Sequence, residues 1–281
     1  MDTVKEKLSG AQGFEKYYSS IFAARWEKLK AALLQESEGV PFDAGAKTYF
    51  LDSASVLVAL TLPLDGAKKI LDMCAAPGGK TLVLARRMEC DAELFSNELS
   101  FERKCRLERV IAEHLLPDVK ERVKITCGDG ALLCKKQDAI YDAILLDAPC
   151  SSERHVLSSP KYLREWSPAR VRSLAMRQWS LLSSAFRILK SGGFLLYSTC
   201  AISDEENSCV AKRLLEKFKG KVRAVEFDEI RILQESNAKK FPELFSKIEF
   251  PSFEKNEFGF SVLPDAQKNS GPIYFFLAEK L

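Results

Sequence analysis

The stretch Leu71-Asp72-Met73-Cys74-Ala75-Ala76-Pro77-Gly78-Gly79-Lys80-Thr81 decides the fold. It joins the end of an apolar run, typical of a buried strand, to a set of small residues and then to a helical pattern. Small residues let the backbone approach a ligand, and a helix N-terminus offers unpaired N–H groups to a carboxylate or phosphate. The stretch therefore predicts a strand–loop–helix unit that binds a small molecule.

Three kinds of ligand compete for this loop. A P-loop requires a glycine five residues before Gly79, but Cys74 stands there. The G-x-G-x-x-G pattern of dinucleotide-binding proteins is also absent from the stretch. We interpret it as a loop for S-adenosylmethionine, with the amino-acid end of that cofactor against the turn.

Strands and helices alternate along most of the chain, which predicts an α/β fold with a doubly wound, mostly parallel sheet and right-handed crossovers. Residues 1–50 carry apolar residues at helical spacing and predict a helical N-terminal extension. Ser203 and Glu206 predict a capping box at the start of a helix. Residues 228–271 are left without assigned elements. The seven expected strands cover residues 69–73, 92–95, 123–126, 143–146, 194–197, 222–227 and 272–278.

Acidic side chains follow four successive strands, at Asp72, Glu98, Asp129 and Asp147. The carboxyl ends of parallel strands form the ligand crevice of such a sheet, and a carboxylate there can accept hydrogen bonds from both ribose hydroxyls. We assign that role to Glu98, while Asp129, beside Gly130, suits an adenine amino group. One acidic residue at a strand end is often only a helix cap, but four together indicate a shared site.

Two cysteines also follow predicted strands, Cys150 after the run 141–149 and Cys200 after the run 193–199. A free cysteine is among the most buried residue types, so packing is the alternative interpretation for either one. Two thiols that reach the same crevice favour thiolate chemistry on a bound substrate.

Composition limits the class of protein. The chain has 281 residues, of which 46% are hydrophobic and 29% charged, as in ordinary globular proteins. No apolar stretch approaches the roughly 18 residues of a membrane span, and no targeting peptide is visible, so we expect a cytoplasmic protein without a membrane contact. The eight cysteines lack C-x-x-C spacing and there are two histidines, so no metal site is expected.

On these residues the chain resembles the Nop/Sun family of RNA cytosine-5 methyltransferases. The pair of Pro-Cys at Cys150 and Thr-Cys at Cys200 is specific to that family. The continuation Ser-Ser-Glu-Arg-His at 151–155 is more similar to the branch with mitochondrial rRNA and tRNA enzymes than to the usual Ser-Gly version. The resemblance covers nearly the whole length and is carried by residues 14–18, 26, 49–55, 74–81, 129–130, 147–150, 164–168, 178, 198–200 and 205–207.

The resemblance implies a Rossmann-like methyltransferase fold, with residues 1–50 as the extension and residues 51–281 as the catalytic domain. It implies that Cys200 is the nucleophile that adds to C6 of a cytosine in rRNA or tRNA, and that Cys150 helps to release the product. Asp147, for the cytosine edge, and Lys80, for positive charge near cofactor or base, are the other catalytic candidates. The implied S-adenosylmethionine pocket consists of Cys74, Ala75, Ala76, Pro77, Gly78, Gly79, Lys80, Glu98, Arg103, Asp129, Gly130 and Asp147.

An RNA substrate requires local positive charge, because the net charge of the chain is only +3. Residues 153–177 carry six basic and two acidic side chains directly after the Pro-Cys motif. A charged run is usually only a solvated surface, but its place beside the crevice favours RNA contact. The candidates for RNA contact are Arg154, Lys161, Arg164, Arg170, Arg172 and Arg177.

Three alternatives remain open at this stage. A DNA cytosine methyltransferase would use Cys150 as nucleophile, with glutamine in place of Ser151. A P-loop NTPase would turn over ATP, and a non-catalytic RNA-binding factor would keep the fold without turnover. Many relatives carry a further RNA-binding domain, so we expect a monomer whose RNA specificity rests on the core, the extension or a partner protein.

Overall fold

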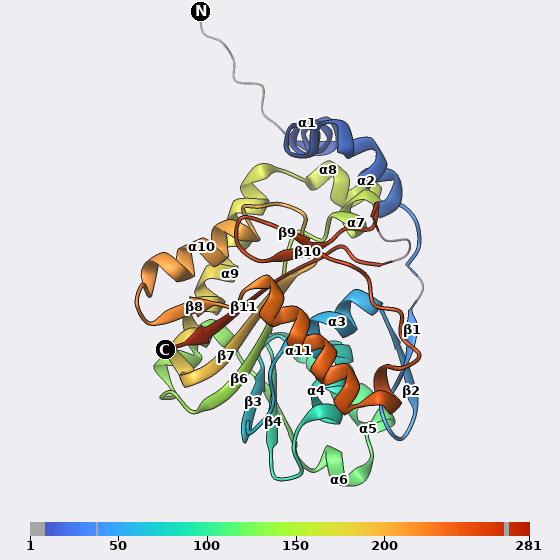
Figure 1. Ribbon diagram of the computed structural model, residues 1–281. Helices are drawn as coiled ribbons and strands as arrows, with labels where there is room; N and C mark the ends of the chain where they lie inside the picture. Colours follow the sequence, from blue (N-terminus) through green and yellow to red (C-terminus); the bar gives the residue numbers. More distant parts are fainter. Residues whose placement is uncertain (1–8, 38, 267–269) are drawn as a thin grey trace, which may run out of the picture.

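The structure is a computed structural model and describes residues 9–37, 39–266 and 270–281. A nine-stranded sheet crosses the middle of the molecule (Figure 1). In spatial order its path is β5-β4-β3-β6-β7-β11-β10-β9, and β8 pairs with β11. The strands are β3 (Lys69–Asp72), β4 (Glu93–Glu98), β5 (Val123–Cys127), β6 (Tyr141–Asp147), β7 (Leu189–Thr199), β8 (Val222–Ala224), β9 (Glu254–Lys255), β10 (Phe260–Val262) and β11 (Ile273–Lys280).

All seven predicted strands are present, although the one expected over 222–227 ends at Ala224 and Phe227 begins a helix, and the prediction of seven was too low. Strands β3, β4, β5, β6 and β7 run parallel to one another, whereas β11 is antiparallel to β7. The two additional strands, β9 and β10, lie in the segment that the sequence left unassigned. They are two and three residues long, too short for an alternating apolar pattern to show.

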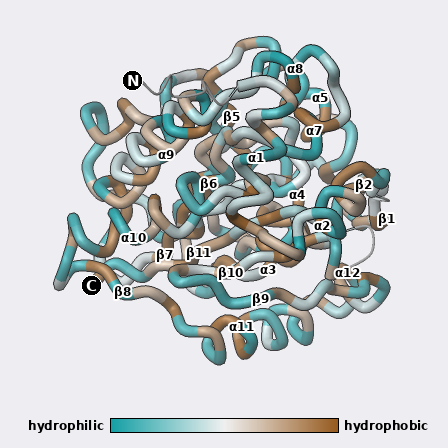
Figure 2. The backbone as a smooth tube through the Cα atoms, turned by 90° about the horizontal axis from the view of Figure 1, so that it is seen from above, coloured by the Kyte–Doolittle hydropathy of each residue, from teal (hydrophilic) through white to brown (hydrophobic). Residues whose placement is uncertain are grey.

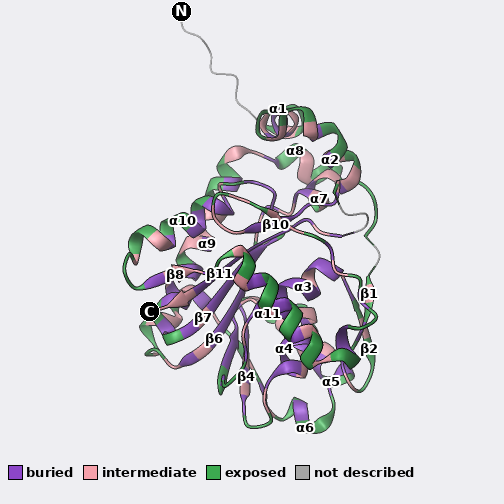
Figure 3. Cartoon of the chain, in the orientation of Figure 1, coloured by how far each residue is buried: buried purple, intermediate pink, exposed green. Residues whose placement is uncertain are grey.

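The central strands are apolar throughout because both faces of the sheet are covered. In β6, Ala143 and Leu145 belong to one core, and Ile144 and Leu146 to the core on the other face. Helices α3 (Ser53–Thr61), α4 (Gly79–Arg87), α5 (Phe101–His114) and α11 (Phe227–Lys240) cover the first face, and α9 (Pro168–Ile188) and α10 (Ser208–Lys217) cover the second. Figure 3 shows the central strands mostly buried and exposed residues on α10 and α11, and Figure 2 shows hydrophilic residues on these two helices.

The order of the strands places a crevice beyond the carboxyl ends of the neighbouring strands β3 and β6. From β3 the chain moves outward to β4 and β5, and then returns to β6 on the opposite side of β3. Such a topological switch point leaves room for a ligand beyond the carboxyl ends of the strands. The loop after β3 and Asp147, the last residue of β6, both lie at this point.

The N-terminal segment packs on one end of the α/β body (Figure 1). Phe14, Tyr18 and Trp26 share a buried cluster with Trp166, which explains their helical spacing. The helices are α1 (Gly10–Phe22), a 3₁₀ turn (Ala23–Arg25) and α2 (Trp26–Leu33), next to α7 (Glu153–Leu157) and α8 (Pro160–Glu165).

The prediction of a helical extension holds to Leu33 and is wrong beyond it. Val40–Asp43 (β1) and Thr48–Leu51 (β2) form an antiparallel hairpin, while residues 1–8 and 38 lie outside the described residues. The remaining short elements are α6 (Pro117–Lys120), a 3₁₀ helix η2 (Gly130–Lys135) and α12 (Pro242–Phe245). Within the described ranges, no helix combines the length and apolarity that a membrane crossing requires.

Candidate active site

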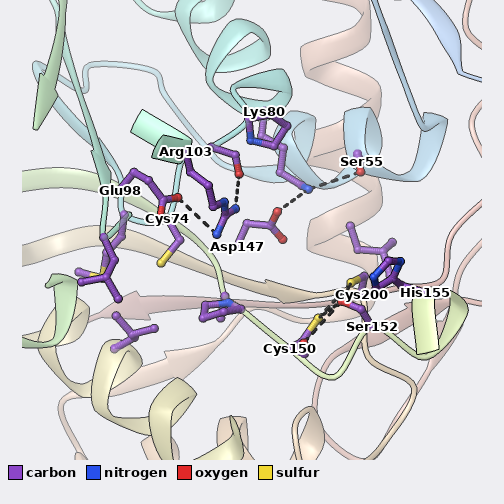
Figure 4. A pocket seen from close by; sticks show the side chains of 18 of the residues that line it. Ser55, Cys74, Lys80, Glu98, Arg103, Asp147, Cys150, Ser152, His155 and Cys200 are labelled. Atoms are coloured by element: carbon purple, nitrogen blue, oxygen red, sulfur yellow. Dashed lines mark hydrogen bonds and ion pairs between the residues drawn. The ribbon is translucent and has the colours of Figure 1, made fainter. Parts of the chain in front are cut away.

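A cavity of about 870 Å³ opens at the switch point. Figure 4 shows Cys74, Glu98 and Arg103 at one end of it, and Cys150 and Cys200 at the other. The volume falls within the range of about 300–1,000 Å³ typical of small-molecule sites. The loop after β3 and the two cysteines, far apart in sequence, therefore share one site.

Eight of the twelve residues expected in the cofactor pocket line this cavity. The other four do not, namely Ala75, Gly78, Gly79 and Asp129. Ala75 and Gly79 line a smaller neighbouring cavity of about 230 Å³. A Cβ on Gly79 would lie 3.2 Å from the ring of Tyr49, so this glycine makes room for the hairpin. Gly78 has φ of 121°, a conformation that favours glycine. The eight that line the large cavity are Cys74, Ala76, Pro77, Lys80, Glu98, Arg103, Gly130 and Asp147.

Glu98 offers a buried carboxylate to the cavity. Its Oε1 accepts a hydrogen bond from the backbone N–H of Ser100 at 3.0 Å. Its Oε2 has no hydrogen-bond partner among the described residues and lies 3.6 Å from Nη1 of Arg103. Arg103 in turn donates to the carbonyl oxygen of Ala76, at 2.6 Å. An oxygen left free in this way fits the ribose hydroxyls of S-adenosylmethionine.

Arg177 lines the same cavity, although the sequence suggested that it contacts RNA. Its Nη2 lies 2.6 Å from Oδ1 of Asp129, and this guanidinium lowers the pKa of the Asp129 carboxyl. Asp129 also accepts a hydrogen bond from the backbone N–H of Ala131 and so begins η2. Asp129 does not line the cavity itself, but its carboxylate holds the Arg177 side chain in the cavity wall.

Lys80 and Asp147 form an ion pair between the two ends of the cavity (Figure 4). Lys80 Nζ lies 2.7 Å from Asp147 Oδ2, and the Ser198 hydroxyl donates to the other carboxylate oxygen at 2.8 Å. Burial alone would lower the pKa of Lys80, but the Asp147 carboxylate outweighs it and raises that pKa. The pair places a fixed positive and a fixed negative charge beside the cysteines.

The two cysteine sulfurs are in contact. Cys150 Sγ and Cys200 Sγ are 3.0 Å apart, and the Ser152 hydroxyl lies 3.3 Å from Cys200 Sγ. The hydrogen bond from the Cys150 thiol lowers the pKa of Cys200, which is exposed to the cavity. The same contact, together with burial, raises the pKa of Cys150. Cys200 is therefore the better nucleophile of the two, because the thiolate is the reactive form.

Glu206 lies behind the Cys150 loop, a position that its sequence did not suggest. Its Oε2 accepts hydrogen bonds from the backbone N–H of Ser151 at 3.0 Å and from the Gln178 side chain at 2.8 Å. The predicted capping box is therefore wrong: α10 begins at Ser208, after Glu206 has turned into the interior. Burial and the neighbouring charge of Glu153 raise the pKa of Glu206 to about 7.

Glu153 is the second fully buried carboxylate of this region, and burial raises its pKa. It accepts hydrogen bonds from the hydroxyls of Tyr18 and Ser151, and from the backbone N–H of Ile202 at 3.2 Å. Ser151 follows Cys150, and Ile202 follows Cys200 by two residues. Glu153 thus ties the two cysteine loops to each other and to α1, which no local sequence signal reveals.

The other residues expected to contact RNA divide into two groups. Arg154 is partly buried, lines the cavity and donates to the carbonyl oxygens of Gln35 and Gly271. The other four side chains are exposed around α8 and the start of α9, namely Lys161, Arg164, Arg170 and Arg172.

Residues 59–275 match the family of 16S rRNA methyltransferases RsmB/F. The chain belongs to this family. The match to the RsmB/F family confirms the resemblance that the cysteine motifs suggested, and the family depends on S-adenosylmethionine. The 5-cytosine rRNA methyltransferase NSUN4 of Xenopus laevis is 33% identical over 231 residues, which are 81% of this chain and 55% of that protein. The chain thus spans about half the length of this relative.

Solved structures agree with the RsmB/F assignment. NSun6 from Pyrococcus horikoshii, solved with the S-adenosylmethionine analogue SFG, is 25% identical with a TM-score of 0.62. The alignment covers 84% of this chain and 53% of that one. The protein PH0851 has a TM-score of 0.74 at 18% identity, over 96% of this chain and 66% of that one. The fold is thus that of a class I S-adenosylmethionine-dependent methyltransferase.

Proposed function

We propose that this protein transfers a methyl group from S-adenosylmethionine to C5 of a cytosine in ribosomal RNA. The observation that carries the proposal is the contact of Cys150 and Cys200, 3.0 Å apart, in the cavity that Glu98 and Arg103 enter from the other end. Membership of the RsmB/F family supports the same reaction.

The cofactor end of the site is supplied by the loop after β3 and by Glu98. The free Oε2 of Glu98 would accept hydrogen bonds from the ribose, and the start of α4 lies near the amino-acid end. When bound, S-adenosylmethionine supplies an electrophilic methyl group on a sulfonium. Asp147 and Lys80 separate this end of the cavity from the cysteines and would orient the base between them.

Cys200 supplies the covalent step. C5 of cytosine is a weak nucleophile, so a direct transfer to it is slow. When the Cys200 sulfur bonds to C6, the π electrons of the C5–C6 bond move to C5, which then takes the methyl group. A base such as water in the cavity then takes the C5 proton, and the electron pair of the C5–H bond restores that double bond and expels the Cys200 sulfur as a thiolate. We assign Cys150 to this release step, in which its thiol donates a hydrogen bond to the departing sulfur.

The RNA must present its cytosine out of a stack, since C6 is inaccessible within a helix. The exposed side chains Lys161, Arg164, Arg170 and Arg172, on α8 and the start of α9, would contact phosphates. A ribosomal substrate is favoured over tRNA because the RsmB/F family and NSUN4 are both rRNA methyltransferases. The cytoplasmic location, the monomeric state and a protein partner for specificity stay predictions.

Two cysteine variants test the proposal. Cys200→Ala removes the nucleophile, so neither transfer of labelled methyl to rRNA nor a covalent adduct should form. Cys150→Ala leaves the attack intact but slows release, so an enzyme–RNA adduct should accumulate on denaturing gels when the cofactor is present. Cys90→Ala, at an exposed position, is the control and should act like the wild type.

The contrary outcomes are distinct. An adduct with Cys200→Ala and none with Cys150→Ala would reverse the two roles, as in DNA cytosine methyltransferases. Full activity in both variants would reduce the cysteines to packing residues. An inactive wild type that still binds rRNA would favour a non-catalytic RNA-binding factor.

A further inference from the structure

Ser152 has an unusual backbone conformation. Its φ of 55° and ψ of 63° lie in the left-handed region, where a side chain crowds the backbone. Among the described non-glycine residues, Ala23 is the only other one with positive φ. Strained residues of this kind persist at sites where the side chain has a function.

The hydroxyl of Ser152 does not serve the helix that it precedes. Ser152 is the N-cap residue of α7, and an N-cap serine normally accepts a hydrogen bond from a backbone N–H of the first turn. In the part of the chain that the structure describes, the side chain makes no such bond. The left-handed conformation directs the hydroxyl elsewhere.

The hydroxyl lies instead beside both sulfurs. Ser152 Oγ is 3.3 Å from Cys200 Sγ and 3.6 Å from Cys150 Sγ, and Figure 4 shows these three side chains together. It also lies 3.5 Å from the carbonyl oxygen of Cys150. A hydroxyl has one proton to donate, and a thiolate is the strongest acceptor within its reach.

We propose that Ser152 is a catalytic residue whose hydroxyl donates a hydrogen bond to the Cys200 thiolate and so keeps the nucleophile ionised and oriented toward C6. This inference rests on the proposed role of Cys200. It gives the thiolate two donors, the Cys150 thiol and the Ser152 hydroxyl.

The proton of Ser152 stays on its oxygen throughout the reaction. As the Cys200 lone pair forms the bond to C6, negative charge leaves the sulfur for the ring, and the hydroxyl can turn to the Cys150 carbonyl oxygen. When the C6–sulfur bond breaks, the electron pair returns to Cys200 and the hydroxyl again stabilises the thiolate. Ser152 thereby lowers the energy of the leaving sulfur as well as that of the attacking one.

The test is Ser152→Gly, which removes the hydroxyl and relieves the strained backbone. If Ser152 had only a structural role, the Ser152→Gly variant would be at least as stable as the wild type and its Cys200 equally reactive. Our proposal predicts a higher apparent pKa of Cys200, read from the pH dependence of iodoacetamide alkylation of the Cys200 peptide without RNA or cofactor. It also predicts a fall in kcat of about ten- to hundredfold with little change in KM for rRNA, since a hydrogen bond to a charged group is lost.

Two further variants act as controls. Ser152→Ala removes the hydroxyl but keeps Cβ and the strained backbone, so it should raise the apparent pKa of Cys200 and lower kcat as Ser152→Gly does. Ala23→Gly relieves positive φ far from the cysteines and should change neither quantity.

An unshifted alkylation profile in Ser152→Gly would overturn the proposal, whether or not kcat falls. An unshifted profile in Ser152→Ala would overturn it as well. If the profile shifts in Ser152→Gly while the wild type methylates no rRNA, the contact of Ser152 with Cys200 stands and the proposed function fails.

Discussion

Replacing Glu206 by glutamine should change how the stability of the protein depends on pH. Burial and the charge of Glu153 raise the pKa of Glu206 from its usual 4.5 to about 7 in the folded protein. Between these two values the folded state holds a proton that the unfolded chain has released. The free energy of unfolding therefore falls as pH rises through this window, at about 1.4 kcal/mol per pH unit, and about 3 kcal/mol is lost in all.

Glu206→Gln stays neutral and should lack this loss. The amide oxygen can still accept from the Ser151 N–H and from Gln178, which share one carboxylate oxygen in the wild type. Urea unfolding at about pH 5 and about pH 8 should therefore show a fall in stability that is smaller by about 3 kcal/mol in the variant. Asp72, whose pKa burial also raises to about 7, contributes equally to both proteins and cancels in the difference.

Glu216→Gln is the matched control, because Glu216 is exposed on α10 and meets water in both states. Its pH dependence should equal that of the wild type. If Glu206→Gln loses as much stability between the two pH values as the wild type does, Glu206 is ionised when folded. The buried carboxylate pair would then need another source of charge compensation.

The remaining predictions concern the cofactor, the RNA surface and the N-terminal helices. Glu98→Gln should weaken S-adenosylmethionine binding about tenfold, because an amide donates where the carboxylate accepts; unchanged affinity in calorimetry without RNA would exclude Glu98 from the site. Reversing the charge of Arg170 and Arg172 together should weaken rRNA binding and flatten its salt dependence, since fewer counterions are released, and an unaltered salt slope would move the RNA elsewhere. Arg25→Ala removes ion pairs with Asp265 at 2.7 Å and with Glu254 at 2.9 Å, and a third of the Arg25 side chain is exposed, so a loss of about 1 kcal/mol is expected in urea unfolding; no change would show that these ion pairs do not hold the N-terminal helices.

The sequence predicted the sheet well because its central strands are continuous apolar runs between helices of clear periodicity. It also placed Glu98 and Asp147 at the site, since residues at the carboxyl ends of parallel strands must converge, and Lys80, in the first turn of the helix after the β3 loop. It failed where side chains act across the fold. The spacing of Ser203 and Glu206 matches a capping box, yet the stronger partner of Glu206 is the N–H of Ser151, 55 residues away.

Charge counting likewise did not reveal the partner of Arg177. Arg177 contributes to a basic stretch in sequence, but a long side chain can point along either side of its helix. Asp129, from a loop 48 residues earlier, holds its guanidinium at the cavity wall. A local sequence pattern does not indicate in which direction a side chain points or which residue it contacts.

The hydrogen bond from Tyr18 to Glu153 makes α1 a part of the catalytic unit rather than an appendage. A chain cut after this helix would remove one of the two hydroxyls that donate to the buried Glu153 carboxylate and would uncover Trp166, so a fragment meant to keep the cysteine loops in place should begin before Gly10. For protein engineering this sets a boundary. A foreign RNA-binding domain can be fused ahead of α1, but it cannot take the place of α1.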